Sequence, residues 1–268
     1  MTAALPLPAG ACDTHLHIYD ASYPAAPTAV LRPPDAGVDD YRAVQAELGL
    51  ERLVIVQPTT YGMDNRCQLA AMAELDDTTR GVMVVDGRTD PTELARMTDL
   101  GVRGARFFML DGGAVGWDAL EPTAELIAPF GWHVQLQMNG RDLAGRLGRL
   151  LRLPVDLVVD HVGRFMPPGG VEHPGFEALL ALLEAGRAWV KLSAPYESSA
   201  DLDDVLPLVD ELVARHPDRL LWATNWPHPG QVAPPSPEML AALCHRWLPD
   251  PDLRRRVLVD NPTARYDF

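Results

Sequence analysis

The chain has 268 residues, 47% of them hydrophobic, and a formal net charge of -14. This apolar content supplies a large core and excludes a disordered chain, and the acidic balance argues against nucleic-acid or anionic-membrane partners. No apolar run has the length of a transmembrane helix. The first residues, MTAALPLPAGACD, lack the basic and apolar regions of a signal peptide, so we expect a cytoplasmic protein. The composition leaves the oligomeric state open.

Eight short apolar segments recur along the chain, most of them separated by helical patterns. They cover residues 11–19, 52–58, 81–86, 104–109, 133–138, 157–162, 189–194 and 220–225. Continuous runs such as RLVIVQP suit strands that are buried on both faces of a parallel sheet. Apolar residues at helical spacing predict helices between them, over 40–50, 176–186 and 202–217.

Strands that alternate with helices form right-handed parallel crossovers. Eight such units predict an α/β fold, a (β/α)8 TIM barrel that forms a single domain over residues 1–268. A doubly wound sheet is the alternative, but no GxGxxG or Walker motif follows an early strand. Two proline-rich loops, 23–34 and 227–237, come directly after strands and are expected on the catalytic face of the barrel.

Catalytic groups of such barrels gather at the C-terminal ends of the strands. The first strand ends in DTHLH, and alternate strand residues share a side, so His15 and His17 could bind a metal or a carbonyl oxygen together. The sixth ends in DHVGR, where His161 could carry a proton and Arg164 could bind a carboxylate. Buried structural histidines and a surface arginine are the alternative interpretation of both segments.

Four segments in this order, DTHLH, GVRGARF, DHVGR and NWPHP, resemble the amidohydrolase superfamily, in particular amidohydrolase-related family 2, over nearly the whole chain. They are most similar to the branch with 2-pyrone-4,6-dicarboxylate lactonase, 4-sulfomuconolactone hydrolase and D-galactarolactone isomerase. The resemblance implies a lactonase-type hydrolase or a lactone isomerase, with a small carboxylated lactone as its partner. Its implied roles are carbonyl polarisation by His15, His17 and His161, and substrate binding by Tyr61, Asn65, Arg106, Gln137, Arg164, Tyr196 and His228.

One departure from that pattern falls on the catalytic base. The family has aspartate where this chain has Asn225, and an amide cannot accept a proton at neutral pH. Either the chain carries an inactivating substitution, or it uses another base, for which His161 and His228 are the candidates.

Two further departures concern metal and substrate. Metal-using relatives add a lysine or histidine on strand five, where this chain has Gln135 and Gln137, both poor zinc ligands. We therefore expect a metal-independent enzyme without a cofactor. The alternative is a hydrolase or decarboxylase with Zn or Mn on His15, His17 and His161, and a third possibility is a non-catalytic binding protein. The stretch LDGG (110–113) replaces a second arginine of the pyrone-dicarboxylate enzyme, which argues against a dicarboxylated pyrone as the substrate.

Overall fold

The computed structural model describes residues 6–268 and contains one sheet of eight parallel strands in the order β1 to β8. The strands are β1 (Cys12–Leu16), β2 (Arg52–Val56), β3 (Thr79–Met83), β4 (Val102–Phe108), β5 (His133–Gln137), β6 (Leu157–Val159), β7 (Ala188–Leu192) and β8 (Leu220–Trp222). Each of the eight expected segments contains part of one strand. These runs are apolar almost throughout because the strands are covered on both faces.

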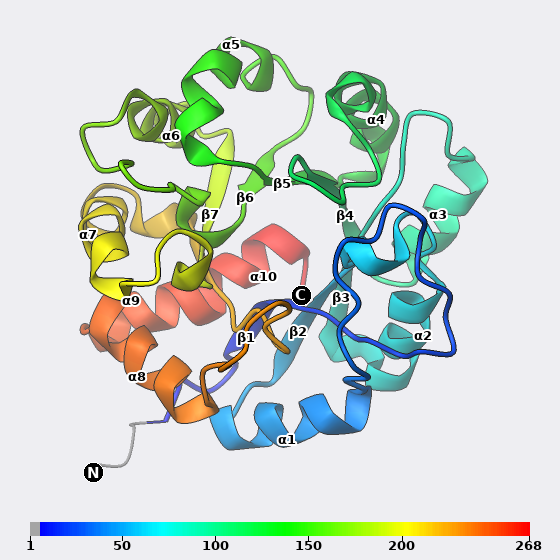
Figure 1. The fold of residues 1–268 in the computed structure, drawn as a ribbon, viewed down its shortest axis with the longest axis horizontal. Helices are drawn as coiled ribbons and strands as arrows, with labels where there is room; N and C mark the ends of the chain where they lie inside the picture. Colours follow the sequence, from blue (N-terminus) through cyan, green and yellow to red (C-terminus); the bar gives the residue numbers. More distant parts are fainter. Residues whose placement is uncertain (1–5) are drawn as a thin grey trace.

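The barrel closes between its first and last strands. Leu16 forms a parallel bridge with Trp226, and the amide of Asn225 donates to the carbonyl of His15 at 2.9 Å. Figure 1 shows the strands inside a ring of helices. The expected single-domain (β/α)8 barrel is confirmed.

The α-helices follow one another in chain order. They are α1 (Val38–Leu48), α2 (Arg66–Leu75), α3 (Pro91–Asp99), α4 (Leu120–Ile127), α5 (Leu147–Leu150), α6 (Pro174–Glu184), α7 (Leu206–Arg215), α8 (Pro237–Trp247), α9 (Pro251–Arg255) and α10 (Asn261–Tyr266). The helix expected from residue 202 begins as a 3-10 turn, and the α-helix starts at Leu206, one residue before Pro207, which needs no amide partner in the first turn. Within residues 6–268, none of the helices combines the length and the hydropathy that a membrane crossing requires.

The C-terminal helix α10 closes the N-terminal end of the barrel. The ring of Tyr266, which is fully buried, packs against His133 at the start of β5, with 5.4 Å between the ring centres. The side chain of Asn261 donates to the carbonyl of Leu220 at the start of β8. An apolar layer that includes Cys12, Val158 and Tyr266 lies at this end. The opening of the barrel is therefore at the other end, where the strands finish.

Candidate active site

A cavity of about 530 Å³ lies at the C-terminal mouth of the barrel. This volume is in the range of small-molecule sites. The two proline-rich loops reach it through Leu31 and Pro229. Its polar lining comes from several strand ends and consists of His17, Tyr19, Thr59, Arg106, Asp111, Gln137, His161, Arg164, Glu197 and Asn225.

A bulge in β1 turns both histidines of the HxH segment into the barrel. Asp13 pairs with Leu53 on β2, but Leu16 pairs with Ile55, so β1 contains one more residue than its partner over this stretch. After the bulge the usual alternation of side chains places His15 and His17 on the inner side. His17 lines the cavity, whereas His15 lies beneath it and is completely buried.

The two histidines form a chain of hydrogen bonds with defined proton positions. Burial and Arg106 lower the pKa of His17 to about 3, and burial together with Lys191 lowers the pKa of His15, so both rings are neutral at pH 7. His17 Nδ1 lies 2.7 Å from the carbonyl oxygen of Val56, which can only accept, so this nitrogen carries the proton. Nε2 of His17 is then the acceptor for Nε2–H of His15 at 3.2 Å. His15 Nδ1 is left without a proton.

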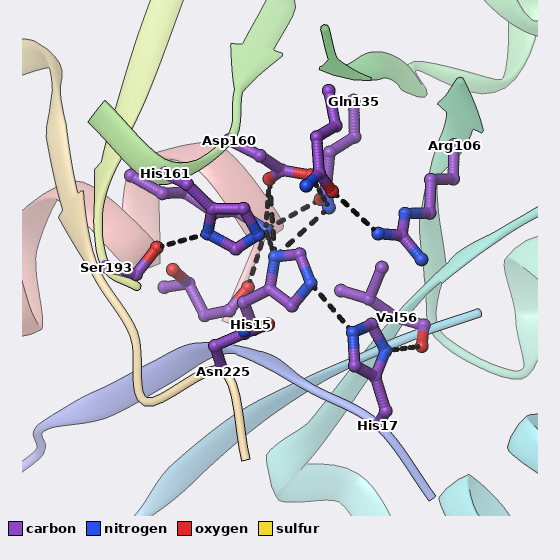
Figure 2. Close-up of polar contacts among 12 residues, drawn as sticks. His15, His17, Val56, Arg106, Gln135, Asp160, His161, Ser193 and Asn225 are labelled. Carbon is purple, nitrogen blue, oxygen red and sulfur yellow. Dashed lines mark hydrogen bonds and ion pairs between the residues drawn. The ribbon is translucent and has the colours of Figure 1, made fainter. Parts of the chain in front are cut away.

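The sequence analysis missed a second polar layer, which lies beneath the cavity. Lys191 on β7, completely buried, donates to Gln135 Oε1 at 2.7 Å, and its Nζ lies 3.6 Å from Asp160 Oδ1. Gln135 Nε2 donates to the other oxygen of Asp160 at 3.1 Å (Figure 2). Lys191 is the only lysine of the chain, and a lysine in the middle of a buried strand was the available signal.

His161 follows β6 in an unusual backbone conformation. His161 and Val162 have φ of 53° and 54°, in the left-handed region that non-glycine residues seldom occupy. Such backbone is a feature of functional sites. Nδ1 of His161 lies 2.9 Å from Ser193 Oγ at the end of β7, and the imidazole lines the cavity. Burial lowers the pKa of His161 well below its ordinary value, so this ring is also neutral.

Of the two arginines that line the cavity, one is paired with a carboxylate and the other bonds only to neutral groups. Arg106 is buried and donates to the carbonyl of Gln57 at 2.6 Å and to Gln137 Oε1 at 2.9 Å. Its Nε is buried without a hydrogen-bond partner. Arg164 instead pairs with Glu197, with 3.1 Å between Nε and Oε2. Arg106 therefore offers the cavity a positive charge that no neighbouring carboxylate has taken up among the described residues.

Asn225 lines the cavity, and hydrogen bonds on the side away from the cavity fix its side chain. Its Nδ2 donates to Tyr196 Oη at 2.9 Å, and the tyrosine hydroxyl in turn donates to His228 Nδ1 at 2.8 Å. Asn225 Oδ1 is buried without a hydrogen-bond partner. Burial lowers the pKa of His228 to about 4. Of the two candidate replacement bases, His161 reaches the cavity lining and His228 does not.

Two of the expected pocket residues have contacts elsewhere. Tyr61 Oη bonds to the backbone of Asp20, and the Asn65 side chain bonds to both backbone groups of Val84. Neither lines the cavity, and two further residues expected to bind substrate, Tyr196 and His228, do not line it either. The side chains of Tyr61 and Asn65 instead bind backbone groups of neighbouring loops, at Asp20 and at Val84.

Metal-type ligands converge in one place, with a different membership from the expected set. In the part of the chain that the structure describes, His15, Asp160 and His161 each offer a ligand atom, and these atoms lie within 4.8 Å of one another. The expected trio contained His17 in place of Asp160. Because Lys191 contacts two members of this group, its suitability for a cation depends on that lysine.

A closed parallel barrel with histidines, an arginine and an amide at its C-terminal mouth defines an amidohydrolase-type barrel protein. The chain belongs to the Amidohydrolase family, which it matches over residues 12–268.

The chain is also similar to individual proteins of known activity. It is 36% identical to D-galactarolactone isomerase of Agrobacterium fabrum, over 97% of this chain and 91% of that protein. It is 33% identical to 4-sulfomuconolactone hydrolase of Rhizobium radiobacter, with the same coverage. An apo crystal structure from Agrobacterium tumefaciens superposes with a TM-score of 0.92 at 35% identity, covering 98% of this chain and 97% of that one. The family expected from the four segments is confirmed.

Proposed function

We propose that the protein acts on a small lactone with one carboxylate, by attack of an oxygen on the ring carbonyl. The attack forms a new acyl C–O bond and breaks the ester C–O bond of the ring, and the proton of the attacking oxygen ends on the ring oxygen that leaves. The attacking oxygen belongs to water in hydrolysis, or to a hydroxyl of the substrate in intramolecular acyl transfer. The observation that carries the proposal is the cavity at the barrel mouth, which joins His17, His161, Arg106 and Asn225 in one lining. Relatives named as a lactone isomerase and a lactone hydrolase support the same chemistry.

The charges of the cavity favour a single carboxylate on the substrate. Within residues 6–268 Arg106 forms no ion pair with a carboxylate, whereas Arg164 is paired with Glu197, and Asp111 adds a further negative group to the lining. A guanidinium is well suited to hold one carboxylate. A dicarboxylated substrate would bring its second charge toward Asp111 or Glu197, which repel it.

The histidine cluster and Arg106 would polarise the lactone carbonyl in place of an oxyanion hole. His161 lines the cavity and would donate its Nε2–H to the carbonyl oxygen, with the Ser193 hydroxyl donating to its Nδ1. His17 gives its only N–H to Val56 and accepts from His15, so these two rings would form the wall beside the carbonyl, and the positive charge would come from Arg106.

Position 225 would orient the attacking oxygen. Asn225 Oδ1 is buried without a hydrogen bond, so it can accept one from a water molecule or a substrate hydroxyl. The amide cannot remove the proton, and this chain is therefore expected to turn over lactones slowly. A carboxylate at the same place would supply general-base catalysis, worth about 10²- to 10⁴-fold in rate.

Turnover of muconolactones and aldarolactones by the wild type and by Asn225→Asp tests the proposal. The φ of 62° at position 225 suits aspartate as well as asparagine, so the change adds the base without new backbone strain. We expect Asn225→Asp to raise kcat about 10²-fold or more on at least one monocarboxylated lactone. Oxygen-18 from water enters the product in hydrolysis and stays out of it in acyl transfer.

Asn225→Gly is the matched control, because glycine also accepts this backbone conformation but offers no base. It should leave kcat at or below the wild-type value. Absence of turnover on every lactone by both the wild type and Asn225→Asp would refute the enzymatic proposal. Binding of a lactone without turnover in both proteins would instead favour a binding protein.

A further inference from the structure

The only lysine of the chain lies in the middle of the barrel, with no access to solvent. Its Nζ donates to the carbonyl of Thr14 at 2.7 Å and to Gln135 Oε1 at 2.7 Å. The third N–H faces His15 Nδ1 at 3.3 Å, with Asp160 Oδ1 at 3.6 Å. An ammonium has three donors, and Lys191 directs all three at groups that can accept.

The atoms that face Lys191 are also the ones a metal would use. His15 Nδ1 and Asp160 Oδ1 lie 3.3 Å apart, and Asp160 Oδ1 is buried without a hydrogen bond. Together with His161 they form the converging trio of ligand residues. A carboxylate oxygen and an unprotonated imidazole nitrogen are good ligands for zinc. The same two atoms already face the ammonium, so a divalent ion there would meet a positive charge in a dry interior, where charges are poorly screened.

The cavity side of the histidine pair offers a weak alternative. His15 Nε2 and His17 Nε2 lie 3.2 Å apart, but one of them carries the proton that joins the two rings. The neighbouring position 225 is a neutral amide rather than a carboxylate. Neither side of the histidine cluster therefore fits a divalent ion while Lys191 is charged.

We propose that the ammonium of Lys191 is the resident cation of this barrel: it holds His15 and Asp160 in place and keeps a divalent metal out of the His15, Asp160 and His161 group. Lys191 thereby contacts the group that could hold a metal ion, and it fixes the proton-free state of His15 Nδ1. The inference goes beyond the proposed function because it does not depend on which substrate the cavity binds.

Zinc binding to Lys191→Met tests the proposal without any assay of activity. Methionine retains the length of the apolar stem and removes the charge, which leaves Asp160 and His15 free to bind an ion. We expect Lys191→Met to retain one equivalent of Zn²⁺ after desalting and to bind it at least about tenfold more tightly than the wild type in calorimetry. The double variant Lys191→Met/Asp160→Asn is the matched control and should lose this gain, while zinc on surface histidines is the same in all three proteins.

Wild-type protein that holds one equivalent of zinc, lost on Asp160→Asn, would overturn the proposal. So would a folded Lys191→Met that binds no more zinc than the wild type. A lactone activity would survive either result, and loss of the lactone function would leave the zinc result unaffected.

A second measurement needs only the wild type, in case Lys191→Met does not fold. Because the chain contains one lysine, protein labelled with ¹³Cε-lysine gives a single side-chain signal that requires no assignment. We expect this signal to stay unchanged when Zn²⁺ is added. A zinc-dependent shift or broadening of this signal, absent from Asp160→Asn, would show an ion beside the ammonium and overturn the proposal.

Discussion

Arg106 and Arg164 border the same cavity, but their neighbours leave only Arg106 free to bind a substrate carboxylate. Arg106 is fixed by Gln57 and Gln137 and forms no ion pair with any acidic side chain that the structure describes, while Glu197 neutralises Arg164. A guanidinium that is held by neutral acceptors keeps its charge available to a ligand. One that is already paired contributes mainly to the shape of the wall, because a second carboxylate must compete with the first.

Arg106→Gln should abolish the preference of the site for a carboxylated lactone over its methyl ester. Hydrogen bonds to a charged group are worth about 1.5 to 3 kcal/mol, or about 10- to 150-fold in Kd. Calorimetric titration of each variant with the acid and the ester measures this ratio, in which general damage to the fold cancels. Arg164→Gln is the matched control and should change the ratio less than about tenfold. An Arg164→Gln protein that loses the preference while Arg106→Gln keeps it would reverse the assignment.

The residues at the rim of the barrel could be predicted from the sequence, and those beneath it could not. His17, Arg106, His161 and Asn225 end strands in recognisable segments, and all line the cavity. Lys191 belongs to a layer that exists only because side chains from different strands meet inside the barrel. The inward direction of each side chain depends on strand register, and the bulge in β1 shifts that register by one residue.

At the scale of elements, the strands were predictable and the ends of the helices less so. An apolar run that is buried on both faces marks a parallel strand, and each of the eight runs contains all or part of one strand. Helix α7 begins at Leu206 and not at the expected residue 202, because residues 202–205 form a 3-10 turn before Pro207. Tyr61 and Asn65 follow β2, but their side chains bond to backbone groups of neighbouring loops, and the sequence pattern does not show this direction.

The joint between β1 and β8 depends on one buried carboxylate. Asp13 accepts from the amide of Thr224 at 3.0 Å, from the amide of His15 at 3.1 Å and from the hydroxyl of Tyr41 at 2.9 Å. It thus ties the first strand to the last strand and to α1. Burial raises the pKa of Asp13, and these hydrogen bonds oppose that rise.

Asp13→Ala should destabilise the whole barrel, because it leaves several buried donors unpaired at the closing joint. Such a loss costs about 3–5 kcal/mol, measured as the decrease in the free energy of unfolding in urea. Tyr41→Phe removes only one of the donors and should cost about 1 kcal/mol. Equal costs for the two variants would mean that the tyrosine bond, rather than the joint with Thr224, carries the stability.

For the molecule as a whole, the buried neutral histidines make the free energy of unfolding depend on pH, and most of them belong to the site. The pKa values of His15, His17, His133, His161 and His228 are all lowered, chiefly by burial. In the unfolded chain each returns to about 6.5. Four of the five belong to the catalytic mouth and its support, whereas His133 packs against Tyr266 at the opposite end.

These shifts predict that the protein loses stability as the pH falls below about 6.5. In that range these histidines are protonated in the unfolded chain and neutral in the folded barrel. The free energy of unfolding therefore rises with pH by about 1.4 kcal/mol per pH unit for each histidine that is fully protonated only in the unfolded chain. Urea unfolding between pH 7.5 and pH 5 measures the slope.

His133→Phe removes one titrating group far from the site. Among the described residues neither ring nitrogen of His133 has a hydrogen-bond partner, so the variant should fold. Its slope should be lower by about 1.4 kcal/mol per pH unit at pH 5. A stability that stays level from pH 7.5 to pH 5 in the wild type would mean that these histidines are protonated inside the folded barrel, and the neutral hydrogen-bonded chain from His17 to Lys191 would then be wrong.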